Sequence, residues 1–169
     1  SSHRPPDGSS DRRRLPGTAA VRRSPAAVAT AGGTGVIHHA IWNYSEIGDT
    51  VLTSDWYWGA YNLLCSEAKR KLDTYSLFDE NQHFNSSAFS EKVKELLGKQ
   101  DALLIIINTP AHNPTGYSFS EEDWTKVLDI CKEHTKNGQK KITLLVDIAY
   151  IDFAGEKNEC RKFMKQFSN

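Results

Sequence analysis

Short apolar runs alternate along the chain with stretches in which apolar residues recur every three or four positions. The runs predict β-strands and the periodic stretches predict helices. Strands are expected at residues 27–31, 49–53, 73–78, 102–107 and 142–146, and helices at residues 36–44, 60–71, 86–97, 120–137 and 160–167. Because strand and helix alternate about five times, the pattern predicts an α/β fold with a mostly parallel sheet and helices on both faces.

The apolar run at 102–107 ends in a turn that is rich in proline and polar residues. Its length and its β-branched residues are typical of a strand buried on both faces. Pro110 and Pro114 cannot continue a ladder, so the turn leaves the sheet and presents Asn113. Ligands of open α/β sheets bind at such carboxyl ends. An ordinary strand-to-helix turn would show the same pattern.

A second apolar run, at 142–146, also ends in a polar residue. Asp147 follows the run directly, and Tyr150 comes three residues later. Parallel neighbouring strands would bring Asn113, Asp147 and Tyr150 to one edge of the sheet. The alternative for Asp147 is a strand-end residue that only caps the next turn.

A glycine-rich stretch at 32–35 separates the first expected strand from the first expected helix. Free backbone N–H groups and the positive end of the helix dipole would make an anion site there. Gly32 and Gly33 would let the backbone approach the anion closely, and Thr34 would add a hydroxyl donor. The stretch lacks the three spaced glycines of a dinucleotide site and the lysine of a P-loop. A tight turn without a ligand is the alternative.

Four aromatic residues fall within the six positions 56–61. Such a concentration on a loop is costly without a function, and a flat aromatic platform under a planar ring is one function it could serve. A cluster of core side chains is the alternative.

Composition narrows the class of protein. The chain has 169 residues, enough for one domain with a real core, and 38% hydrophobic and 25% charged residues are ordinary for a globular protein. No apolar run has the length of a membrane span, and no signal peptide is visible. Three cysteines far apart in the sequence favour reduced thiols in the cytoplasm over a disulfide frame or a metal site.

Residues 1–26 differ from the rest in composition. They carry six arginines and two aspartates, a net charge of +4, whereas the remaining residues carry 15 basic and 19 acidic side chains, a net charge of −4. Four of the six prolines also lie there. We expect a disordered or foreign basic segment. A nucleic-acid-binding arm is disfavoured because no aromatic residue alternates with the arginines.

The two strand-end motifs, Asn113-Pro114-Thr115-Gly116 and Asp147-Ile148-Ala149-Tyr150, together resemble the class I/II aminotransferases, which are pyridoxal-phosphate (PLP) enzymes of fold type I. The resemblance runs from about Ala27 to the end of the chain. It implies that residues 27–169 are an incomplete large, PLP-binding domain. Single residues take the following implied cofactor roles: Gly32, Gly33 and Thr34 at the phosphate, Trp58 stacked on the ring with Trp56 as the alternative, Asp147 at the ring nitrogen, and Asn113 and Tyr150 at the phenolic oxygen.

The resemblance also implies an activity, transfer of an amino group between an amino acid and a 2-oxo acid, by an enzyme that is a homodimer at full length. Neither nucleic acid nor membrane is expected as a partner. The family's Schiff-base lysine lies further along the chain than residue 169, and Lys157, Lys162 and Lys165 follow Tyr150 too closely to replace it. We therefore expect an inactive fragment with no catalytic residue of its own. A non-catalytic module that binds PLP or phosphate, or a PLP-dependent lyase of the same fold, remain alternatives.

Overall fold

A computed structural model describes residues 27–167 and contains one four-stranded sheet. All neighbouring strands are parallel, and their order is β2-β1-β3-β4. The strands are β1 (Thr50–Ser54), β2 (Lys71–Tyr75), β3 (Ala102–Asn108) and β4 (Lys141–Asp147). The predicted α/β class with a parallel sheet is confirmed.

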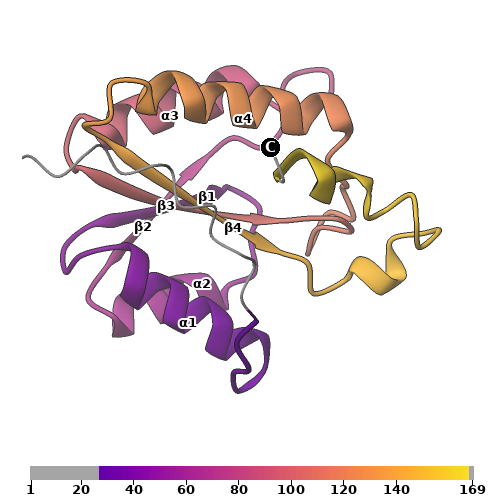
Figure 1. The fold of residues 1–169 in the computed structure, drawn as a ribbon, viewed down its shortest axis with the longest axis horizontal. Helices are drawn as coiled ribbons and strands as arrows, with labels where there is room; N and C mark the ends of the chain where they lie inside the picture. The colour runs from indigo at the N-terminus through magenta and orange to yellow at the C-terminus, as the bar shows by residue number, and fades with distance from the viewer. Residues whose placement is uncertain (1–26, 168–169) are drawn as a thin grey trace, which may run out of the picture.

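Helices cover both faces of this sheet (Figure 1). One layer contains α1 (Gly32–Tyr44) and α2 (Ala60–Glu67), and the other contains α3 (Ser86–Leu97) and α4 (Glu121–Thr135). Two short 3-10 helices follow β4, namely η1 (Ile151–Phe153) and η2 (Lys162–Phe167). No helix within residues 27–167 is long and apolar enough to cross a membrane.

Strand β3 is the centre of the core. Leu103, Ile105 and Ile107 point to the layer of α3 and α4, whereas Leu104 and Ile106 point to the layer of α1 and α2. This alternation follows from the two-residue period of a strand. All five side chains are buried, and each contributes about 1.5–3 kcal/mol of hydrophobic stabilisation. The prediction of a strand buried on both faces is confirmed.

Side-chain caps fix the starts of two helices. The Asn85 side chain accepts a hydrogen bond from the backbone N–H of Ala88 and caps α3, so the predicted caps Ser86 and Ser87 were wrong by one or two positions. Ser120 caps α4 as predicted and forms a capping box with Asp123.

The first and last predicted elements differ from the structure. Residues 27–31 form no strand. Their small side chains bury little surface, and their backbone pairs with no strand in the described chain. Helix α1 begins at Gly32 and not at residue 36, so the glycines form its first turn. The expected helix at 160–167 is only a 3-10 segment. The sheet therefore has four strands in place of about five, and the prediction for residues 1–26 lies outside the described residues.

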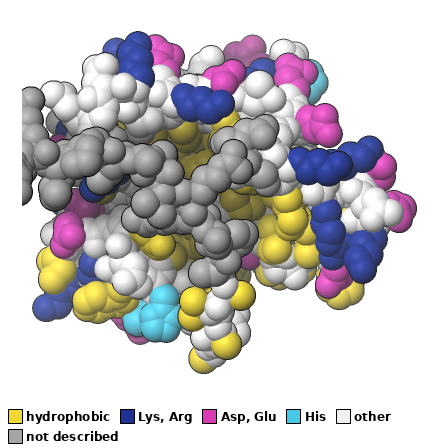
Figure 2. Space-filling view, in the orientation of Figure 1, with side chains coloured by type: hydrophobic (Ala, Val, Ile, Leu, Met, Phe, Trp, Pro, Cys, Tyr) yellow, Lys and Arg dark blue, Asp and Glu magenta, His cyan; other side chains and the backbone are white. Residues whose placement is uncertain are grey.

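Strand β4 is an edge strand, and in the described part of the chain it pairs only with β3. Its residues 142–147 are half-buried. Hydrophobic side chains are visible in Figure 2 along the line that β4 takes in Figure 1.

Strand β2 lies on one side of β1, whereas β3 and then β4 are added on the other side. The direction in which successive strands are added therefore reverses between β1 and β3. The carboxyl ends of such strands flank a crevice in open α/β sheets.

Candidate functional site

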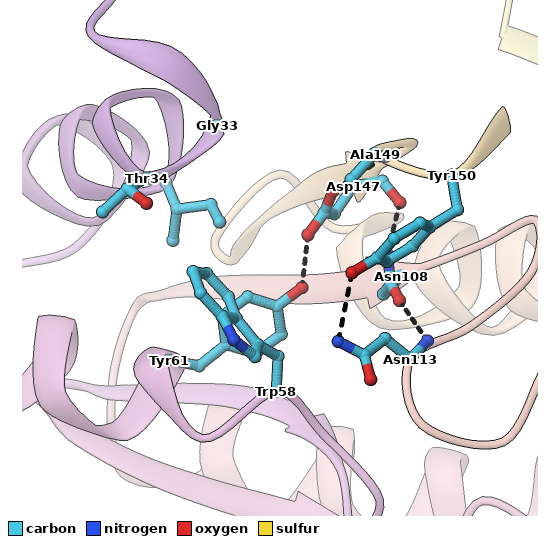
Figure 3. A pocket seen from close by; sticks show the side chains of 10 residues that line it. Gly33, Thr34, Trp58, Tyr61, Asn108, Asn113, Asp147, Ala149 and Tyr150 are labelled. Carbon is cyan, nitrogen blue, oxygen red and sulfur yellow. Dashed lines mark hydrogen bonds between the residues drawn. The ribbon is translucent and has the colours of Figure 1, made fainter. Parts of the chain in front are cut away.

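A cavity of about 180 Å³ lies at the carboxyl edge of the sheet, between the start of α1, the β1–α2 loop and the ends of β3 and β4 (Figure 3). It is lined by Gly33, Thr34, Ile37, Trp58, Tyr61, Asn108, Asn113, Asp147, Ala149 and Tyr150. Six of the seven residues predicted to bind a cofactor are in this set. The seventh, Gly32, precedes Gly33 and does not line the cavity.

The Asp147 carboxylate lies at the end of β4 and is held from two sides. Its Oδ2 accepts a hydrogen bond from the Tyr61 hydroxyl at 2.6 Å, and its Oδ1 accepts one from the backbone N–H of Ala149 at 3.1 Å. Burial raises the pKa of Tyr61 well above its ordinary value, and the hydrogen bond to Asp147 and the negative charge there raise it further. Tyr61 therefore stays protonated and donates a hydrogen bond to the carboxylate.

Asn108 ties the ends of β3 and β4 together. Its Nδ2 donates to the backbone carbonyl of Asp147 at 2.9 Å, and its Oδ1 accepts from the backbone N–H of Asn113 at 2.7 Å. The Asn113 side chain then donates through Nδ2 to the Tyr150 hydroxyl at 3.3 Å. Asn113, Asp147 and Tyr150 thus lie at one edge of the sheet and form one connected polar wall (Figure 3).

Trp58 forms an apolar wall beside this polar one. Its ring packs edge-on against Tyr61, with ring centroids 5.9 Å apart and an angle of 83° between the planes. Trp58 is 39% exposed and lines the cavity, whereas Trp56 is 55% exposed and does not line it. The alternative of an aromatic core cluster applies to Tyr61, which is buried, and in part to Tyr57.

The first turn of α1 closes the cavity on the side opposite Asp147. Gly32 needs a glycine conformation, with φ of +68°, and its N–H donates to the Thr30 carbonyl. The following N–H groups of a helix have no partner within the helix, and no side chain caps α1. A Cβ added at Gly33 would meet no atom within 4 Å. Backbone donors at Gly33 and Thr34 are therefore accessible to an anion.

Sequence reasoning missed Tyr61 and Asn108 as cavity residues. Both carried a signal. Tyr61 lies three residues after Trp58, almost one helical turn, and Asn108 is the first polar residue after the apolar run of β3. The Tyr61 hydroxyl donates a hydrogen bond to Asp147, and the Asn108 side chain accepts one from Asn113. These contacts depend on how the strands pair, so the sequence alone does not reveal them.

Metal-ligand chemistry finds no support in the described chain. Within residues 27–167, no three histidine, cysteine, aspartate or glutamate side chains are grouped to hold a metal ion. Cys65, Cys131 and Cys160 are free thiols. Burial raises the pKa of Cys65 to about 11 and that of Cys131 to about 12, so both are unreactive at neutral pH.

Comparison with known protein families matches the chain to aminotransferase class I and II over residues 14–167. The mitochondrial aspartate aminotransferase of Dictyostelium discoideum is 27% identical over 136 residues, which are 79% of this chain and 30% of that protein. The aromatic-amino-acid aminotransferase of Pseudomonas aeruginosa is 25% identical over 129 residues, which are 75% of this chain and 30% of that protein.

Comparison with solved structures gives the same picture. An aminotransferase from Anaerococcus prevotii superposes with a TM-score of 0.81 at 41% sequence identity. The match covers 83% of this chain and 34% of that one. The chain thus spans about a third of the length of the proteins it matches.

Proposed function

Because the chain belongs to the aminotransferase class I and II family, we propose that it is the cofactor-binding part of a PLP-dependent aminotransferase. Such an enzyme moves an amino group between an amino acid and a 2-oxo acid. The proposal depends on one observation, the cavity in which Asn113, Asp147 and Tyr150 lie opposite the start of α1. Substrates and a homodimeric assembly belong to the full-length protein, since this chain spans only about a third of its relatives.

The donors and acceptors around the cavity suit PLP. When bound, this cofactor supplies an electron-withdrawing pyridine ring. Asp147 offers an anionic acceptor for the ring nitrogen, and Trp58 offers an apolar face for the ring. The N–H groups of Gly33 and Thr34, with Gly32 at the turn before them, offer an anion site for the phosphate.

Asp147 keeps capacity for a ligand although two donors already hold it. A carboxylate has about four lone-pair positions, and Tyr61 and Ala149 use two of them. A protonated ring nitrogen can take a third. The negative charge of the half-buried Asp147 would hold that proton in place.

Asn113 and Tyr150 provide the donors for the phenolic oxygen of the cofactor. The Tyr150 hydroxyl accepts from Asn113 Nδ2, so its own proton is free to donate to a ligand. The Asn113 amide has a second N–H for the same purpose. Asn108 fixes the Asn113 backbone, which restricts the positions that the Asn113 amide can take before a ligand binds.

No lysine lines the cavity in the part of the chain that the structure describes. We therefore propose that this chain binds PLP reversibly and forms no covalent bond to it through a lysine. A non-catalytic module that binds PLP is the second candidate. The cavity without a lining lysine in the described residues favours it as well. A sequence that continues beyond residue 169 with a lysine able to reach the cavity would distinguish the enzyme from the module.

Equilibrium titration of the chain with PLP, followed by borohydride reduction and mass spectrometry, tests the proposal. We expect saturable binding and no stoichiometric adduct on any one lysine. Asp147→Ala and Asn113→Ala should each weaken binding about tenfold or more, the value of one hydrogen bond to a charged or polar group. Asp129→Ala, an exposed aspartate on α4, is the matched control and should bind normally. Equal binding by all four proteins would contradict the proposed site.

A further inference from the structure

Asp55 is an exposed aspartate at the start of the loop that carries Trp58 to the cavity, and it has no part in the function proposed so far. It follows β1 directly and does not line the cavity. Its Oδ1 accepts two backbone hydrogen bonds, one from Trp56 at 3.0 Å and one from Leu77 at 2.9 Å. Leu77 lies just beyond the end of β2, so one carboxylate oxygen connects two segments that are 22 positions apart in the sequence.

The segment that Asp55 contacts is fixed in the core. Leu77 is 1% exposed and belongs to the core cluster that also contains side chains of α3 and α4. Its carbonyl accepts a hydrogen bond at 2.9 Å from the backbone N–H of Asn85, the cap of α3. The backbone N–H of Asp55 also donates to the Tyr75 carbonyl at the end of β2, at 2.8 Å. Asp55 therefore attaches the start of the loop to a buried part of the molecule through both its backbone and its side chain.

The rest of the loop is held by contacts between near neighbours. The Ser54 hydroxyl donates to the Trp56 carbonyl and Asp55 accepts from the Trp56 N–H, so both backbone polar groups of Trp56 are engaged. The Trp58 carbonyl accepts from the Tyr61 N–H at 2.9 Å, and the Trp58 ring packs edge-on against Tyr61 at the wall of the cavity (Figure 3). Only one residue separates Trp56 from Trp58, so the position of the Trp58 ring depends on where Asp55 holds the loop.

We propose that Asp55 is a positioning residue whose carboxylate fixes the β1–α2 loop against the buried segment after β2 and thereby holds the Trp58 ring at the cavity. Without the carboxylate, the two N–H groups bond to water and the start of the loop gains conformational freedom. A ring that is free to move must be ordered when a ligand binds, and this ordering weakens binding. The role deepens the proposed function and rests on it only where PLP binding is the readout.

Three variants test the role through PLP binding. Asp55→Ala removes the acceptor and should weaken binding at least about fivefold, the cost of ordering roughly one side chain. Asp55→Asn keeps a carbonyl oxygen that can accept both hydrogen bonds, so it should bind within about twofold of the wild type. Asp79→Ala is the matched control and should bind as the wild type does. Asp79 Oδ1 also accepts two backbone hydrogen bonds, from Asn81 and His83 at 2.9 Å each, but in a loop that does not line the cavity.

A Trp58→Ala background shows whether Asp55 acts through the ring. If Asp55 affects binding only by holding Trp58, adding Asp55→Ala to Trp58→Ala should change binding less than about twofold. A further loss as large as the one that Asp55→Ala causes alone would overturn the role. So would an Asp55→Asn variant that binds as weakly as Asp55→Ala, because the acceptor oxygen would then not be what matters.

Nitrogen-15 and proton NMR provide a readout that does not need the cofactor. The indole N–H signal of Trp58 should shift in Asp55→Ala, and the nuclear Overhauser contacts between the Trp58 and Tyr61 rings should weaken. Both should stay in place in Asp55→Asn and Asp79→Ala. These results would support the role even if the wild type failed to bind PLP, which would refute only the proposed function. Unchanged Trp58 signals in Asp55→Ala, or an equal shift in Asp79→Ala, would overturn the role of Asp55.

Discussion

At the scale of single residues, the most consequential contact is the hydrogen bond between Tyr61 and Asp147. Tyr61 is buried, so Asp147→Ala leaves its hydroxyl without a partner and should cost about 1–3 kcal/mol of unfolding free energy. Tyr61→Phe removes the hydroxyl itself, so no unpaired donor is left when Asp147 is also replaced. A double-mutant cycle by urea denaturation should therefore give a coupling energy of about 1–2 kcal/mol.

The same cycle on Asn113 and Tyr150 gives a comparison at a more exposed site, where their 3.3 Å contact is weaker. We expect a coupling energy below about 1 kcal/mol there. If the Tyr61 cycle gave no more than the Asn113 cycle, the hydroxyl of Tyr61 would not be held by Asp147 in solution.

His112 should make the stability of the chain depend on pH in one direction. Burial lowers its folded-state pKa below the ordinary 6.5, so below that pH the unfolded chain takes up a proton that the folded chain refuses. The stabilisation is complete above pH 6.5 and is lost as the pH falls toward the folded value, by at most about 1.4 kcal/mol per pH unit. Urea denaturation at pH 7.5 and 5.5 should show a larger loss for the wild type than for His112→Gln. His83→Gln, which replaces an exposed histidine, is the control and should lose as much as the wild type.

At the scale of elements, the capping box of α4 combines two kinds of contact. Ser120 Oγ accepts from the Asp123 N–H at 3.1 Å, and Asp123 accepts from the Ser120 N–H and from the Tyr117 hydroxyl. Burial and the bond to Asp123 raise the pKa of Tyr117 to about 12, so Tyr117 is the donor. Ser120→Ala should cost about 1 kcal/mol, the value of an N-cap, and Asp123→Ala should cost more because it leaves two donors unpaired.

Thermal denaturation measures the loss of stability in both variants. Glu133→Ala, on the exposed face of α4, is the control. Equal losses for Ser120→Ala and Asp123→Ala would mean that Tyr117 contributes nothing through Asp123.

The sequence predicted most elements because their patterns are local. The five apolar side chains from Leu103 to Ile107 and the Ser120 cap needed no tertiary information. The prediction failed at residues 27–31, where a run of small side chains has the pattern of a strand but forms none. It also failed at Gly32, because the glycines that were expected to form a loop are the first turn of α1. The convergence of Asn113, Asp147 and Tyr150 could be predicted from parallel pairing alone, but the contacts of Asn108 and Tyr61 depend on strand register and helix rotation.

At the scale of the whole molecule, the sheet has a well-covered centre and two edge strands, β2 and β4. Strand β3 is buried on both faces, whereas β4 is half-buried along residues 142–147 and pairs on one side only within the described chain. An edge strand whose apolar side chains are only half-buried offers unpaired backbone groups to another chain. We therefore expect the isolated chain to associate as its concentration rises.

A charge on the β4 edge should oppose this association without disturbing the core. Thr143 is half-buried on β4, between Ile142 and Leu144, which pack against the core. Thr143→Lys places a solvated charge on that edge, a substitution that natural edge strands use against pairing. Light scattering across a concentration series should show less association for Thr143→Lys than for the wild type. Thr125→Lys on the exposed face of α4 adds the same charge elsewhere and should associate as the wild type does. Equal suppression by both variants would assign the effect to net charge, and β4 would then not be the surface that associates.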